Sequence, residues 1–325
     1  MTVLTRTVGE LPAAGTVHIH KVFLHVTRAC NLRCDYCYLS AGKPAADEMR
    51  TQEYARLWPQ LAALGPEKVV LTGGEPLLRP DLLSLLRDLR DADPEHRILR
   101  CLNTNGLLIT PLLAGELVGL ADEVRVSIDA LADRNDAMRG QGSFQAALRA
   151  LEHLHAIGFE PKVMVTVTPA GLTDLIDLLC LLTERNITRI SLHRVRPVGR
   201  GRRYRRWRPE SDELAAAMRL AWERCYPGRP ASFEADAGAR PTCAAGSFLN
   251  IMPNGDVFPC HVLTSPEFQG GNVRRQSVAE ICSADSLLGD LQRLGSGAAE
   301  IRDEGLAARV RTFGCIDQEG PEYGT

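Results

Sequence analysis

Short runs rich in β-branched residues alternate with longer amphipathic segments between about residue 20 and residue 195. The short runs predict strands at residues 20–27, 68–72, 97–103, 124–128, 162–167 and 189–194. The amphipathic segments predict helices at residues 52–64, 82–91, 111–118, 144–157 and 175–185. In the last segment, Leu175, Leu178, Leu179 and Leu182 form one apolar stripe, which indicates a helix with a buried face.

These six predicted strands alternate with helices, which favours right-handed βαβ units and a parallel sheet. Six units are too few for a closed eight-stranded barrel. We therefore expect an α/β fold, a partial (β/α)6 TIM-like barrel. By analogy with full barrels, its chemistry should lie at the carboxyl ends of the strands.

The pattern changes after residue 194, because residues 194–208 contain eight arginines and two glycines without an apolar period. A helix is predicted at about residues 210–225, and the Pro-, Gly- and Ala-rich stretch 227–241 marks a boundary. Beyond it, two apolar runs flank an Asn-Gly turn, which predicts a β-hairpin. This organisation gives an N-terminal arm (1–19), the barrel (20–209), a linker helix and loop (210–241) and a small α+β domain (242–325).

The composition is that of a globular protein, with 45% hydrophobic residues, 24% charged residues and a formal net charge of −2. This balance argues against binding to nucleic acid or membranes over much of the surface. The chain has no apolar run long enough to span a bilayer, and its first residues do not resemble a signal peptide. We therefore expect a cytoplasmic protein whose ten cysteines serve metal or redox chemistry more readily than disulfides.

Three of these cysteines, Cys30, Cys34 and Cys37, lie close together in C-N-L-R-C-D-Y-C, directly after the first predicted strand. Thiolates on one loop can surround a [4Fe–4S] cluster, and three of them leave one iron open for another ligand. A zinc site is the alternative, but it needs a fourth ligand such as His20 or His25.

The pattern C-x3-C-x-aromatic-C, with Tyr36 as the aromatic residue, resembles the signature of the radical S-adenosylmethionine (SAM) superfamily. The resemblance implies that the open iron chelates SAM. An electron from the cluster then cleaves SAM to a 5′-deoxyadenosyl radical, which abstracts a carbon-bound hydrogen from the substrate. It also implies an electron donor such as flavodoxin or ferredoxin.

Further motifs at predicted strand ends agree with this resemblance. In T-G-G-E-P the two glycines can let a ligand approach the backbone, and the glutamate can accept hydrogen bonds from an ammonium group. By resemblance this motif binds the methionyl amino group, and S-I-D lies near the SAM carboxylate and ribose. The cofactor-binding residues predicted in this way are Gly73, Gly74, Glu75, Pro76, Asn103, Ser127, Asp129 and Arg139. Asn103 and its neighbour Asn105 can equally be turn formers.

In the C-terminal part, Cys243, the hairpin and Cys260 resemble the opening of the SPASM and twitch extensions, which hold auxiliary iron–sulfur clusters in radical SAM enzymes. A full SPASM domain continues with a dense cysteine run, whereas here only Cys282 and Cys315 follow. We therefore predict a twitch-like domain with at most one auxiliary cluster. Cys243 and Cys260 are its expected ligands, and Cys282 and Cys315 are further candidates. A metal-free hairpin is the alternative.

The sequence favours a small polar natural product, a sugar or an aminocyclitol, as substrate. Only about twenty residues precede the first strand, which leaves no room for the leader-binding domain that peptide modifiers commonly carry. We predict epimerisation with Cys315 or Cys282 as hydrogen donor, and the alternatives are dehydrogenation by an oxidoreductase or modification of a ribosomally made peptide. An iron–sulfur scaffold protein is the non-catalytic alternative.

The arginine-rich segment 194–208 has three interpretations. It can be a solvated crossover, or its guanidinium groups can bind an anionic substrate. With Tyr204 and Trp207 interleaved, it can also contact RNA, although the net charge argues against a nucleic-acid partner.

Overall fold

The computed structural model describes residues 17–205, 211–228, 246–296, 305–306 and 310. The strands of this part are β1 (Lys21–Thr27), β2 (Lys68–Gly73), β3 (Leu99–Thr104), β4 (Glu123–Ser127), β5 (Lys162–Val167), β6 (Ile190–Arg194), β7 (Phe248–Ile251), β8 (Asp256–Phe258) and β9 (Gly271–Asn272). Its α-helices are α1 (Thr51–Leu64), α2 (Leu82–Ala92), α3 (Pro111–Leu117), α4 (Ala132–Arg139), α5 (Ser143–Ala156), α6 (Pro169–Leu172), α7 (Leu175–Glu184), α8 (Ser211–Cys225), α9 (Val278–Ile281) and α10 (Leu287–Ser296). The same described part contains the short 3-10 helices η1 (Pro76–Leu78), η2 (Gly199–Tyr204) and η3 (Pro266–Phe268).

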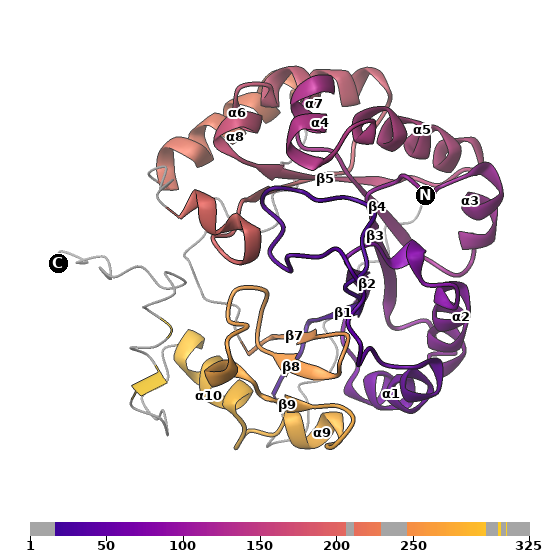
Figure 1. Cartoon of the computed structure of the whole chain (residues 1–325), viewed down its shortest axis with the longest axis vertical. Helices are drawn as coiled ribbons and strands as arrows, with labels where there is room; N and C mark the ends of the chain where they lie inside the picture. Colours follow the sequence, from indigo (N-terminus) through magenta and orange to yellow (C-terminus); the bar gives the residue numbers. More distant parts are fainter. Residues whose placement is uncertain (1–16, 206–210, 229–245, 297–304, 307–309, 311–325) are drawn as a thin grey trace.

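These strands form one sheet in the order β6-β5-β4-β3-β2-β1-β7-β8-β9. Strands β1 to β6 pair in parallel with their sequence neighbours, which confirms the predicted α/β partial barrel. Figure 1 shows the strands as an open arc with the helices on its outer side. The described C-terminal strands are not a separate layer, because β7 pairs in parallel with β1 and thereby extends the barrel sheet.

The two faces of the barrel sheet differ in chemistry. Alternate side chains such as Leu24, Leu71 and Leu102 are fully buried in the main hydrophobic core, which includes residues of the surrounding helices. Their neighbours, such as His25 and Asn103, point to the opposite, inner face because successive side chains of a strand alternate. The concave inner face, called the lumen below, is therefore the polar side of the sheet.

The predicted elements agree with this structure within about two residues for most strands and helices of the barrel. Helix α4 was not predicted, because residues 132–139 are mostly polar and offer no apolar stripe. None of the helices in the described ranges is long and apolar enough to cross a membrane.

Candidate active site

The loop after β1 carries the three clustered cysteines at the carboxyl edge of the sheet. It is closed by backbone hydrogen bonds from Cys30 N to Gly42 O (3.0 Å) and from Gly42 N to Arg28 O (2.9 Å). The thiols of Cys30, Cys34 and Cys37 are unbridged, and all three residues are half-buried. Short loops of this kind suit a cubane, whose irons each take one thiolate.

Backbone amides already point at two of these sulfur atoms. Leu32 N lies 3.4 Å from Cys30 Sγ, and Ala41 N lies 3.4 Å from Cys37 Sγ. Burial raises the pKa of Cys30 and of Cys34, so each thiolate needs a compensating partner. Amide donors and bound iron both supply such compensation, and the cysteine loop therefore fits an iron–sulfur cluster.

The histidines proposed as a fourth zinc ligand are engaged elsewhere. His20 Nδ1 lies 2.9 Å from Glu67 Oε1, and His25 Nε2 lies 2.7 Å from Asn250 Oδ1. These contacts disfavour the zinc alternative.

The two glycines of T-G-G-E-P allow a close approach between two backbone segments. A Cβ atom on Gly73 would collide with Thr27 O, and one on Gly74 would collide with Ala29 O. Gly73 also has a φ of 139°, which L side chains rarely adopt. Glycine is therefore required at both positions so that the end of β2 can lie against the end of β1 and the start of the cysteine loop. Gly74 N donates a hydrogen bond to Thr27 O (2.8 Å).

Glu75 follows these glycines and is buried, with 1% of its surface exposed. Its carboxylate accepts hydrogen bonds from Thr104 Oγ1 (2.8 Å), Asn105 N (2.7 Å) and Leu77 N (3.2 Å). Burial nevertheless raises its pKa to about 7, against the opposing effect of these donors. A cation placed beside Glu75 would restore the charged form, which fits the predicted contact with an ammonium group. Pro76 begins η1 directly behind it.

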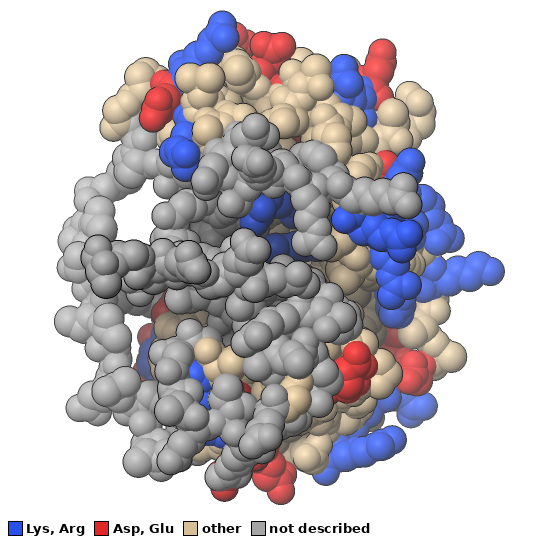
Figure 2. Space-filling view, turned by 90° about the vertical axis from the view of Figure 1, so that its left-hand side faces the viewer, with Lys and Arg blue, Asp and Glu red and all other residues tan. Residues whose placement is uncertain are grey.

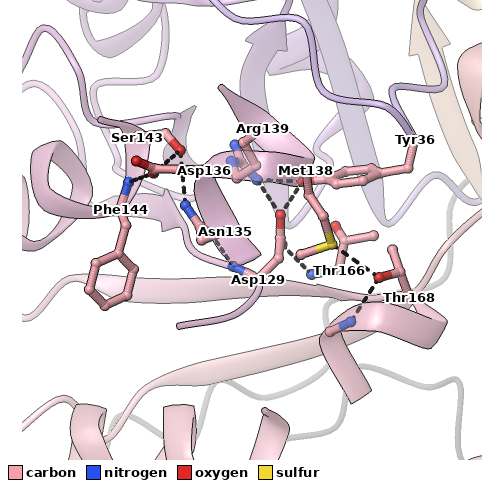
Figure 3. A network of polar contacts seen from close by, with 11 residues as sticks. Tyr36, Asp129, Asn135, Asp136, Met138, Arg139, Ser143, Phe144, Thr166 and Thr168 are labelled. Carbon is pink, nitrogen blue, oxygen red and sulfur yellow. Dashed lines mark hydrogen bonds and ion pairs between the residues drawn. The ribbon is translucent and has the colours of Figure 1, made fainter. Parts of the chain in front are cut away.

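Asp129 lies at the centre of a buried polar network just beyond the end of β4 (Figure 3). Its carboxylate pairs with Arg139 Nη1 at 2.7 Å, accepts a hydrogen bond from Thr166 N at 2.6 Å and contacts the Tyr36 hydroxyl. Tyr36 belongs to the cysteine loop, so this network ties the loop to β4, β5 and α4. Asp129 is thus engaged by protein groups, and its geometry suits a residue that positions others.

Arg139 keeps one donor available. It is buried and bonds Asp129 and the Tyr36 hydroxyl (2.6 Å), but its Nε has no partner. Burial opposes its charge, yet Tyr36 and Asp129 hold the pKa of Arg139 well above its usual value. A buried guanidinium with an unused N–H fits a carboxylate ligand.

Other predicted residues lie at the same edge of the sheet. Asn103 faces the lumen near the end of β3, where its Nδ2 lies 3.4 Å from Thr72 Oγ1 and its buried Oδ1 has no partner. Asn105 is a turn residue that also supports the site. Its backbone N donates to the Glu75 carboxylate, and its side-chain Nδ2 donates to Asn31 Oδ1 (2.8 Å). Ser127 is half-buried at the last position of β4.

The C-terminal cysteines differ in their surroundings. Cys260 follows β8, and the amides of Val262 and Leu263 each lie 3.4 Å from its Sγ, as suits a thiolate ligand. Cys282 is fully buried in the main hydrophobic core, and burial raises its pKa to about 12. These apolar surroundings do not favour the roles predicted for it, metal ligand and hydrogen donor. Cys243 and Cys315 lie outside the described residues.

A hydrogen-bonded set that no sequence motif indicates links the lumen to Cys260. Asn250 Oδ1 lies 2.7 Å from His25 Nε2 and 3.1 Å from His261 Nδ1. Asn250 Nδ2 donates to the Cys260 carbonyl (3.3 Å), which fixes the amide so that both imidazoles donate to its oxygen. Burial lowers the pKa of His25 to about 4, so its ring is neutral and its buried, unpartnered Nδ1 is an acceptor.

The arginine-rich segment is not a free crossover in its described part. Arg200 donates from Nε to Cys34 O (2.7 Å) and from Nη1 to Ala41 O (2.9 Å), and its backbone N donates to Cys37 O (2.9 Å). A Cβ atom on Gly199 would collide with Tyr38 O, so η2 lies directly against the cysteine loop. Trp207, named above in the RNA-binding interpretation, lies outside the described residues.

A family model described as the Radical SAM superfamily matches residues 24–179, and one described as an iron–sulfur cluster-binding domain, SPASM, matches residues 243–296. The mycofactocin maturase MftC of Mycobacterium ulcerans is 34% identical over 266 residues, which cover 76% of this chain and 70% of that protein. This chain belongs to the radical SAM superfamily. The family implies a [4Fe–4S] cluster and SAM as cofactors, and the SPASM domain implies auxiliary iron–sulfur chemistry.

Other radical SAM proteins share parts of the chain. The Fe-coproporphyrin III synthase of Methanosarcina barkeri is 33% identical over 207 residues, which cover 62% of this chain and 51% of that protein. The chain spans 66 to 70% of the length of the mycofactocin maturases that it matches.

Solved structures share the fold at low sequence identity. Streptococcus suis SuiB bound to S-adenosylmethionine has a TM-score of 0.67 at 16% identity, covering 85% of this chain and 68% of that one. Native anSMEcpe with bound AdoMet has a TM-score of 0.65 at 16% identity, covering 85% and 83% of the two chains. Both structural similarities cover 85% of this chain and support its partial-barrel fold.

Replacing Glu75 by Gln should weaken SAM binding at least about tenfold, since one buried charge partner is lost. In the wild-type protein the affinity should rise with pH up to about 7, where Glu75 becomes ionised, and this rise should vanish in Glu75→Gln. Anaerobic calorimetry with SAM measures both effects. Thr104→Val, which removes one donor but keeps the charge, should show a smaller loss. Equal affinity and equal pH dependence in Glu75→Gln would rule out the contact.

Proposed function

We propose that Cys30, Cys34 and Cys37 hold the [4Fe–4S] cluster of this radical SAM enzyme. When bound, the reduced cluster supplies the electron that cleaves SAM. Glu75 would receive the ammonium group of SAM, and the unpartnered Nε of Arg139 would donate to its carboxylate. The Asp129 network holds Arg139 and the cysteine loop in register, which limits the freedom of both.

The surroundings of Cys260 support a second, auxiliary cluster site. Two backbone amides point at its sulfur, and Asn250 fixes its carbonyl. We propose that Cys260 and Cys243 ligate an auxiliary cluster. His25 and His261 would then connect this site to the lumen through Asn250.

The substrate that we propose is a ribosomally made peptide. The observation that carries this proposal is the 34% identity to a mycofactocin maturase, which extends over 76% of the chain. A structure of SuiB with its precursor peptide SuiA shares the fold, with a TM-score of 0.63. The relatives support this alternative more than the epimerisation of a sugar or aminocyclitol that the sequence favoured.

Modification of a tetrapyrrole is a second candidate. Its support is the 33% identity to the Fe-coproporphyrin III synthase of Methanosarcina barkeri and the 32% identity to the AdoMet-dependent heme synthase of the same organism, although these matches cover less of both chains. The product of the first relative, Fe-coproporphyrin III, is therefore the tetrapyrrole to test as a substrate. The two candidates differ in size and chromophore, so one experiment can separate them.

The reconstituted, dithionite-reduced protein should be incubated with SAM and, in parallel, with a mycofactocin precursor peptide, Fe-coproporphyrin III and an aminocyclitol. We expect 5′-deoxyadenosine to accumulate and the mass of the peptide alone to change. The Cys30→Ala, Cys34→Ala, Cys37→Ala triple variant is the control and should leave all three compounds unchanged. A mass change of Fe-coproporphyrin III or of the aminocyclitol, with the peptide unmodified, would refute the peptide proposal.

A further inference from the structure

The exposed face of η2 and of the cysteine loop is strongly basic. Its exposed cationic residues are Arg33, Lys43, Arg202, Arg203 and Arg205, called the basic face below. Figure 2 shows Lys and Arg side chains gathered on one side of the molecule, at the height where Figure 1 draws the loop after β1. The whole chain has a net charge of −2, so this concentration of positive charge is local.

The basic face is directly connected to the predicted cluster ligands. Arg200, within η2, donates to the carbonyl of Cys34, and its backbone N donates to the carbonyl of Cys37. Arg203 and Tyr204 bond the carboxylate of Asp35, between two of the cysteines, at 3.2 and 2.7 Å. A partner that sits on η2 therefore lies next to the loop that carries Cys30, Cys34 and Cys37.

We propose that the basic face is the docking site of the electron donor, a small acidic protein of the flavodoxin or ferredoxin class. The donor gives up one electron at this face and the cluster takes up one, with no bond made or broken. Complementary charge speeds the encounter of such partners, and electron-transfer complexes need only a small interface. An acidic substrate fits less well, because Arg33 and Arg203 of the basic face bond the cysteine loop at Ala41 O and at Asp35.

The test uses two double variants of equal net charge. Arg202→Glu with Arg205→Glu alters the basic face without touching the contacts of Arg200 or Arg203 to the cysteine loop. Arg149→Glu with Arg185→Glu alters two exposed residues at α5 and at the end of α7, and serves as the control. Binding of oxidised flavodoxin to each reconstituted protein is measured at low and high salt, together with SAM cleavage driven by reduced flavodoxin or by dithionite.

We expect the Arg202, Arg205 variant to bind flavodoxin about tenfold more weakly at low salt, with the difference shrinking at high salt. Its flavodoxin-driven SAM cleavage should slow accordingly, while cleavage driven by dithionite stays unchanged. Equal flavodoxin affinity in the two double variants would overturn the proposal. So would a variant that keeps its flavodoxin affinity but loses binding of an acidic peptide or of RNA. Because dithionite bypasses docking, this test is independent of the peptide substrate proposed above.

Discussion

Replacing Asp129 by Asn is expected to destabilise the protein by about 3–5 kcal/mol, because it leaves Arg139 buried and charged without its carboxylate. Asp129 has no exposed surface and Arg139 has 7%, so water cannot compensate. The hydrogen bond from Thr166 N can persist to the amide oxygen, whereas the ion pair cannot. In a chain of this size the change corresponds to a fall in Tm of roughly 4–7 °C. Thermal unfolding of the anaerobically reconstituted protein measures it.

Two further variants identify the cause. Asp174→Asn breaks the ion pair to Arg134, which is 43% exposed, and should cost less than about 1 kcal/mol. The double variant Asp129→Asn, Arg139→Met removes both buried charges and should recover part of the lost stability. If Asp174→Asn is as damaging as Asp129→Asn, or if the double variant is the least stable of all, then the unpaired charge is not the reason.

The barrel could be predicted from the sequence because its signal is local. A buried parallel strand is a short apolar run, and an outer helix has an apolar stripe, so each element can be recognised by itself. Helix α4 was not predicted, because Met138 is among the few apolar residues in a polar segment. Its position is set by tertiary contacts, such as the bond from Asp129 N to Asn135 Oδ1, which no local pattern encodes.

The place of the C-terminal hairpin could not be predicted for a similar reason. The Asn-Gly turn predicts that β7 and β8 pair with each other, but it does not say which barrel strand β7 joins. The parallel pairing of Val22 with Leu249 brings together residues more than two hundred positions apart. The contact between His25 and Asn250 depends on that pairing, so the set that links the lumen to Cys260 is visible only in the fold.

The sequence predicted part of the candidate site, but some of the predicted residues have a different role in the structure. Glu75 lies where a ligand to an ammonium group is expected, but Gly73 and Gly74 are required by the backbone of the cysteine loop. The arginine-rich segment was interpreted from its charge alone, whereas Arg200 is mainly a brace for that loop. The substrate prediction had the weakest basis, since it relied on the length of the N-terminal arm and on no residue that contacts a substrate.

Replacing Cys30, Cys34 and Cys37 together by Ala should abolish SAM cleavage and remove one cluster. We expect roughly eight irons per wild-type chain and about four in the triple variant, if one auxiliary cluster is present. The residual iron should then depend on Cys260, so adding Cys260→Ala should remove most of it. Iron analysis and 5′-deoxyadenosine formation after anaerobic reconstitution measure these effects.

Single variants of other cysteines separate ligation from folding. Cys180→Ala, in α7, should keep all iron and all SAM cleavage. Cys282→Ala should keep the iron as well, because the buried Cys282 thiol lies in an apolar core. Loss of a cluster in Cys282→Ala would restore this residue as a ligand. Four irons that fall to none in the triple variant would mean that the C-terminal region holds no cluster, and Asn250 would then orient His25 for the substrate alone.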